Sequence, residues 1–172
     1  MSDALGRPPS GLTGNLPWTR SCFVCGQDNP HGLRLRSRIE NGHVILNYTP
    51  RESDLGYRHI VHGGIAMTLL DEVMTWAAIA ASRRVCVAAE LSVRLKKPIQ
   101  VGQALRVEGW VVKHTSRLIL TEGLITGADG AGRLAASGKY MPMPEEHARL
   151  TEKDFVSSPD VIPPGRLVGE GE

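Results

Sequence analysis

One long apolar segment, Ile65 to Ser82, constrains the fold of this chain more than any other feature. It contains no Pro or Gly and is rich in Ala, Leu and Met, which favours a helix. Apolar residues cover nearly the whole circumference of that helix, so we expect it to be buried rather than to lie on a surface. Arg83 and Arg84 follow it, close to the negative end of the helix dipole. The rest of the chain must therefore enclose this helix.

Segments with the alternating pattern of β-strands lie on both sides of the helix. Residues 33–38 and 44–48 alternate around Asn41-Gly42, a dipeptide favoured in type I′ turns, and predict a hairpin. Four further strand patterns follow the helix, and no second helix interrupts them. They cover residues 85–97, 104–113, 118–126 and 133–141. Two strands, one buried helix and an antiparallel meander predict an α+β fold, a curved antiparallel sheet wrapped around one long central helix.

The length of 172 residues, of which 41% are hydrophobic, fits one globular domain. Residues 1–20 are rich in Pro and Gly, and we expect a flexible leader there. The domain then covers residues 21–144. Residues 145–172 are acidic and lack periodicity, so we expect an irregular tail that adds nothing to the core. No apolar signal segment opens the sequence, the uncharged stretch 73–82 is too short to span a bilayer, and three cysteines form no disulfide framework. We therefore expect a soluble cytoplasmic protein.

Charge is distributed unevenly along the chain. Residues 1–144 carry 17 basic and 11 acidic side chains, whereas residues 145–172 carry 3 and 7. This mildly basic body is compatible with an anionic small molecule, and equally with an ordinary solvated surface. Its basic residues are not clustered with aromatic ones, so we expect no nucleic-acid partner, and no membrane partner either.

Asp71 and Glu72 are the only charged residues between Ile65 and Ser82. Adjacent residues point about 100° apart on a helix, so the two carboxylates cannot share one environment. At least one of them should lie against apolar neighbours or line a cleft, which is typical of catalytic acids and bases. The alternative is that one carboxylate pairs with an arginine and the other reaches solvent.

His62-Gly63-Gly64 stands where the helix begins. Glycines leave the first N–H groups of a helix unobstructed, and the helix dipole adds positive potential there. Such a terminus can hold an oxyanion or polarise a carbonyl group. The alternative is simply a glycine-rich start of the helix.

Cys22 and Cys25, with His31 nearby, have part of the pattern of a zinc site. Zinc needs four ligands at defined spacing, and no second cysteine or histidine pair follows. We therefore predict a turn over residues 22–32, and no metal. Cys86 lies in a strand pattern and is expected in the core.

Four segments resemble the PaaI-type hotdog-fold acyl-CoA thioesterases. The most specific is HGGIAMTLLDE (62–72), which opens the apolar helix. The others are CFVCGQDNPHGL (22–33), LGYRHIVHGG (55–64) and AELSVRLKKPI (89–99). The resemblance covers about residues 22–142 and implies a hotdog fold that assembles as a homodimer or a dimer of dimers. It also implies hydrolysis of an acyl-CoA thioester without a metal or organic cofactor.

The resemblance also implies roles for individual residues. The Gly63 amide would polarise the thioester carbonyl, and Asp71 would act as general base or nucleophile. His62 and Gly64 would shape the site, and Glu72 is the second candidate for the acid. Basic residues on or beside the strands after the helix could contact the CoA phosphates, or could simply decorate exposed strand edges; these are Arg94, Lys96, Lys97 and Arg117.

Two departures from the family pattern leave other functions open. Many relatives have an Asn in the loop before HGG, where this chain has residues 56–59 without one, and a Ser or Thr where it has Ala88-Ala89. A protein that binds acyl-CoA without hydrolysing it, as a sensor or carrier, is the first alternative. An enoyl-CoA hydratase is the second. Gly63 and Asp71 lie eight residues apart, roughly 12 Å along one helix, so we expect two subunits to share each site.

Overall fold

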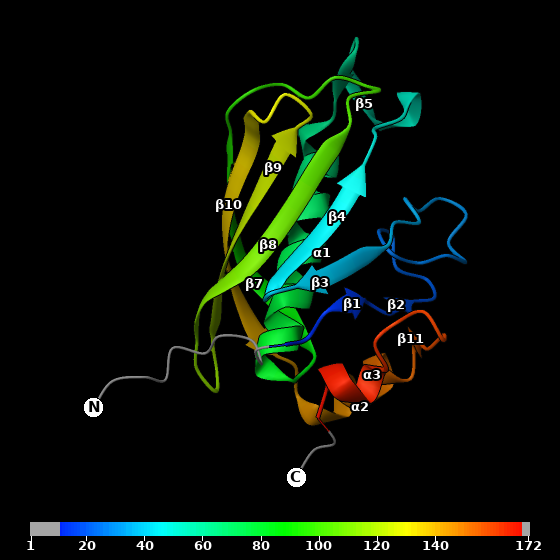
Figure 1. Cartoon of the computed structure of the whole chain (residues 1–172), viewed down its shortest axis with the longest axis vertical. Coiled ribbons are helices and arrows are strands. Elements are labelled where there is room, and N and C mark those ends of the chain that lie inside the picture. The colour runs from blue at the N-terminus through cyan, green and yellow to red at the C-terminus, as the bar shows by residue number, and fades with distance from the viewer. Residues whose placement is uncertain (1–10, 170–172) are drawn as a thin grey trace.

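The computed structural model describes residues 11–169 and has the predicted helix at its centre. This helix, α1 (Gly63–Ser82), begins two residues earlier than expected and runs along one face of the sheet (Figure 1). Ten of its side chains are buried, among them Leu70, Val73 and Met74. Its length and mean hydropathy of 1.3 would also suit a membrane span, but its packing against the sheet is that of a core helix.

Seven strands form the main sheet, and every neighbouring pair is antiparallel. Their order across the sheet is β1 (Gly14–Asn15), β3 (Ser37–Glu40), β4 (His43–Tyr48), β8 (Leu105–His114), β9 (Ile119–Gly127), β10 (Gly132–Pro142) and β7 (Cys86–Leu95). α1 contacts all the strands from β4 to β7 in this order. The predicted α+β architecture, an antiparallel sheet around one long helix, is confirmed.

Two details of the sheet differ from the sequence expectation. β7 does not open a four-strand meander, because it pairs with β10 at the far edge while β8 pairs with β4. The first strand begins at Ser37 rather than Leu33, because the Leu33 and Leu35 amides donate to the Phe23 and Val24 carbonyls instead. The predicted type I′ turn is confirmed, with positive φ at both Asn41 (49°) and Gly42 (82°).

Two glycines of the sheet lie where α1 comes closest to it. Gly109 in β8 and Gly123 in β9 are directly paired across the two strands. A Cβ atom on Gly109 would lie 2.9 Å from the backbone nitrogen of Met74, and one on Gly123 would lie 2.8 Å from the Met74 sulfur. These glycines therefore allow the helix to pack closely on the sheet.

The described part of the expected leader is ordered, so that prediction is wrong for residues 11–20. β1 pairs with β3, and Leu16 is only 1% exposed. Residues 1–10 lie outside the described residues. The leader prediction failed because a few apolar residues without periodicity can still be buried by a distant segment.

That distant segment is the expected tail, which was wrongly predicted to be irregular and outside the core. It forms α2 (Glu145–Glu152), β11 (Phe155–Val156) and α3 (Pro164–Leu167), which gather beside β1 and β2 (Trp18–Thr19) (Figure 1). β11 pairs with β2, and the Ile162 amide donates to the Asn15 carbonyl at 2.8 Å. Leu167 is fully buried. The two chain segments thus complete the core together.

Candidate active site

The side chain of His62 caps the start of α1. His62 occupies the N-cap position, and its Nδ1 accepts a hydrogen bond from the Gly64 amide at 2.9 Å. A Cβ atom on Gly64 would lie 2.9 Å from that same Nδ1, so the cap requires glycine there. Within the described residues the Gly63 amide donates no hydrogen bond. One N–H at the positive end of the helix dipole is therefore available to a ligand.

A pocket of about 420 Å³ lies at this end of the helix. Its walls come from α1, from the short pair β5 (Leu55–Tyr57) and β6 (Ile60–Val61), and from the segment that follows β7. Most of the lining is apolar, and the volume suits a small-molecule ligand. The lining residues are Gly56, Tyr57, Ile60, Val61, His62, Gly63, Ala66, Leu95, Lys96, Lys97, Pro98, Ile99 and Leu134.

Asp71 lies two turns further along α1 and does not line this pocket. Its Oδ1 accepts hydrogen bonds from the Tyr140 hydroxyl at 2.8 Å and from Thr75 Oγ1 at 3.4 Å. Tyr140 is fully buried in β10, and burial together with the Asp71 charge raises its pKa. The tyrosine therefore remains a neutral donor that fixes the orientation of the carboxylate.

Glu72 points into a different environment, as the helical geometry required. Its Oε1 accepts from Trp76 Nε1 at 2.9 Å, and its Oε2 lies 3.8 Å from Cys22 Sγ. Burial, and the charge of the Cys22 thiolate, raise the pKa of Glu72 to about 7. Neither carboxylate forms an ion pair within residues 11–169, so the alternative of pairing with an arginine is not observed.

The candidate CoA-binding residues do not form one group. Lys96 and Lys97 line the pocket, and Arg94 precedes them, exposed on β7. Arg117 lies in the turn between β8 and β9. Arg84, just after the end of α1, contacts this turn, because its guanidinium donates to the Ser116 carbonyl at 3.3 Å. The structure thus brings the two lysines to the start of α1 and leaves Arg117 near its other end.

Sequence reasoning missed two sets of neighbours of the helical acids. Tyr140 could have been suspected, because it occupies an inward position of an alternating strand. The contact of Cys22 with Glu72 had no such signal, since 50 residues separate them and an irregular segment carries the cysteine.

Comparison with known proteins gives a family match over part of the chain. Residues 59–132 match the family model of the thioesterase superfamily. Over that segment the chain is similar to the thioesterase superfamily, and its fold is the hotdog fold. Its resemblance to PaaI-type thioesterases is thereby confirmed. A search of curated proteins gives no match.

Solved structures show the same hotdog fold. A thioesterase superfamily protein is 28% identical, with a TM-score of 0.66 over 71% of this chain and 60% of that one. The PaaI protein of the phenylacetic acid degradation operon of E. coli is 18% identical, with a TM-score of 0.59 over 64% and 78%. An acyl-CoA hydrolase from Staphylococcus aureus, in complex with butyryl-CoA and CoA, is 20% identical, with a TM-score of 0.57 over 61% and 65%.

Proposed function

We propose that this hotdog domain hydrolyses an acyl-CoA thioester to CoA and a carboxylic acid. The observation that carries this proposal is the free Gly63 amide at the start of α1, which lines an apolar pocket together with Lys96 and Lys97. The Gly63 N–H would donate a hydrogen bond to the developing oxyanion of the thioester carbonyl, and the lysines would contact CoA phosphates. The S. aureus relative, an acyl-CoA hydrolase bound to butyryl-CoA, supports this class of substrate.

The carboxylate that activates water in this reaction is that of Asp71. Acting as base, its carboxylate takes a proton from water while the water oxygen bonds to the carbonyl carbon. The C–S bond then breaks, and the departing CoA thiolate takes up the proton. Glu72 is less suited to this role, because Trp76 and Cys22 engage its carboxylate away from the pocket.

The site would be completed by a second copy of the chain. Asp71 lies roughly 12 Å along α1 from Gly63, too far to reach a carbonyl held at the Gly63 amide. β7 is a ten-residue strand at the edge of the sheet, and its apolar Val87 and Leu95 are 41% and 55% exposed. Long apolar edges of this kind pair with another chain. Pairing of two β7 strands about a two-fold axis would set the helices antiparallel and bring one Asp71 toward the partner's pocket.

Release of free thiol from a panel of saturated acyl-CoAs tests the proposal. We expect turnover by the wild-type chain and a loss of ~10²–10⁴-fold in Asp71→Asn, which keeps the shape of the side chain and removes the base. Glu72→Gln is the matched control and should lose much less. A reversed order of the two variants would assign the reaction to Glu72.

The same assay separates the proposal from a binding protein. Tyr57, in the loop where many relatives have Asn, lines the pocket and is 81% exposed. Tight binding of acyl-CoA by calorimetry without release of thiol would identify a sensor or carrier instead.

A further inference from the structure

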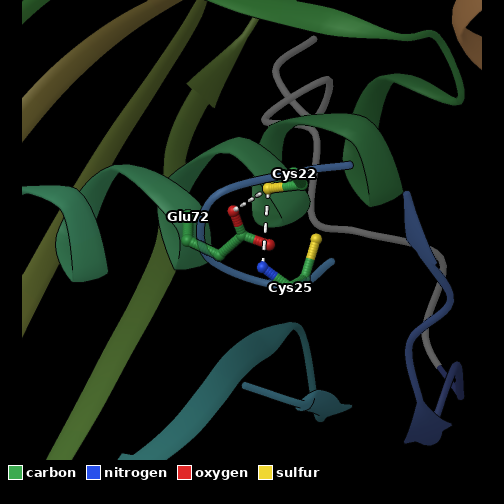
Figure 2. A group of neighbouring side chains, drawn as sticks. All are labelled: Cys22, Cys25 and Glu72. Atoms are coloured by element: carbon green, nitrogen blue, oxygen red, sulfur yellow. Dashed lines mark hydrogen bonds between the residues drawn. The ribbon is translucent and has the colours of Figure 1, made fainter. Parts of the chain in front are cut away.

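The turn at residues 22–25 covers the outer side of α1 and brings two sulfurs to a carboxylate. Figure 2 shows Cys22 and Cys25 beside Glu72, which extends from the helix toward them. The two Sγ atoms and a carboxylate oxygen all lie within 4.8 Å of one another. Cys25 is buried, and Cys22 and Glu72 are partly buried.

These distances suit one tetrahedral metal ion. With Zn–S near 2.3 Å and Zn–O near 2.0 Å, a tetrahedral site separates sulfur and oxygen ligands by about 3.5 Å and two sulfurs by about 3.8 Å. The observed separation of Cys22 Sγ and Glu72 Oε2 is 3.8 Å. Since all three ligand atoms lie within 4.8 Å of one another, side-chain adjustments of up to about 1 Å would let them bind a common ion.

Backbone amides of the turn already point at the sulfur of Cys22. The Val24 and Cys25 amides donate to Cys22 Sγ at 3.3 and 3.5 Å, which stabilises a thiolate. The other oxygen of Glu72 is held by Trp76, as metal-binding carboxylates are by their outer partners. Gly26 allows the tight turn, because a Cβ atom there would lie 2.4 Å from the Cys22 carbonyl oxygen.

We propose that Cys22, Cys25 and Glu72 bind one Zn²⁺ ion, with water as the fourth ligand. Two thiolates select a soft ion such as Zn²⁺ over Mg²⁺ or Ca²⁺. The ion would join the 22–25 turn to the middle of α1, next to Asp71. His31, the third ligand suggested by the sequence pattern, is exposed and is not part of this cluster, whose carboxylate comes from the helix instead.

Metal titration of the tag-free full chain tests this site. The chain is reduced, stripped with a chelator and titrated with Zn²⁺, and with Co²⁺ as a spectroscopic probe. We expect about one equivalent to bind, with the sulfur-to-cobalt absorption band and the visible bands of tetrahedral Co²⁺. Cys22→Ser and Cys25→Ser should each bind Co²⁺ more weakly and show a reduced sulfur band. Cys86→Ser is the matched control and should retain it, because Cys86 lies near Ser82 instead.

Two further variants test the carboxylate. Glu72→Gln should weaken Zn²⁺ binding, and Trp76→Phe, which removes only the hydrogen bond to Glu72 and part of the ring, should weaken it by roughly 10–100-fold. Unchanged affinity in Glu72→Gln would overturn the three-residue site.

Alkylation of the wild-type chain provides a measurement that does not depend on whether a variant folds. Zn²⁺ should protect Cys22 and Cys25 from a thiol reagent, as mapped by mass spectrometry. Equal labelling with and without Zn²⁺, or a Co²⁺ spectrum without a sulfur band, would overturn the proposal.

Discussion

At the scale of single residues, the orientation of Asp71 depends on a tyrosine from another strand. The Tyr140 hydroxyl is 2.8 Å from Asp71 Oδ1, and the tyrosine ring is fully buried. A hydrogen bond to a charged group contributes about 1.5–3 kcal/mol, so its loss should be visible in the chemical step.

Tyr140→Phe should therefore lower kcat by about tenfold and leave KM unchanged, because the phenyl ring preserves the packing while the carboxylate loses its fixed position. Steady-state kinetics measure this split. Tyr48→Phe is a matched control, since it removes a buried hydroxyl that bonds to Asp54. It should reduce the melting temperature and have little effect on kcat. Equal losses of kcat in both variants would show that Tyr140 acts only through stability.

The sequence predicted the divergence of Asp71 and Glu72, because a helix fixes the angle between neighbours. It did not predict what each carboxylate contacts. Tyr140 is 69 residues from Asp71, and Cys22 is 50 residues from Glu72, so both contacts depend on tertiary packing. The helix cap by His62 was nearer to prediction, since it involves only adjacent residues.

At the scale of elements, the contact of α1 with the sheet depends on missing side chains. In Gly109→Ala the new Cβ would meet the backbone of Val73 and Met74 at 2.9 Å, and a helix backbone cannot rotate away as a side chain can. We expect a loss of about 1–3 kcal/mol in the free energy of unfolding, measured by denaturant titration. The matched control is Gly132→Ala in the same sheet. Its new Cβ would lie 3.6 Å from Leu124, an ordinary contact, and a loss as large as that of Gly109→Ala would contradict the packing argument.

The alternation of apolar and polar residues predicted where these elements lie along the chain but not their order across the sheet. α1 and the strands after it begin and end within two residues of the predicted positions, since periodicity reports burial along each segment. The place of β7 at the far edge, beside β10, depends on how the chain passes around α1, and no alternation pattern encodes that. The exposure of its apolar residues is explained by its position at the edge of the sheet, which the sequence does not indicate.

At the scale of the whole molecule, the segment after Pro144 is part of the core. Leu167 is fully buried in α3, whereas Leu150 is 58% exposed on α2. Leu167→Ala should cost about 2–5 kcal/mol, and Leu150→Ala should change stability by no more than about 0.5 kcal/mol. Thermal unfolding of both variants checks this. Equal stability of the two variants would support the original expectation that the tail does not contribute to the core. The segment shows no periodicity because its few apolar residues are buried one at a time.

A mixture of two inactive variants tests the shared site. Asp71→Asn chains are mixed with Gly63→Val chains. Under random pairing, half of the dimers contain one chain of each variant. Each such mixed dimer has one intact site of two. About a quarter of the wild-type activity should therefore return. Native mass spectrometry verifies that both variants dimerise and exchange subunits. Activity near zero in verified mixed dimers would place both groups of a site within one chain.

The N-terminal segment packs against the last part of the chain to be synthesised, since β2 pairs with β11 and Asn15 contacts Asp160. The Asn15 side chain donates to the carbonyl of Asp160, 145 residues later in the chain. At roughly 5–20 residues per second, a ribosome needs about 7–30 s to add that length. During this interval Leu16 and its neighbours have emerged without the partner that later covers them. The newborn chain therefore exposes an apolar N-terminal segment until its last elements are made, and a chaperone that binds early should meet the protein there.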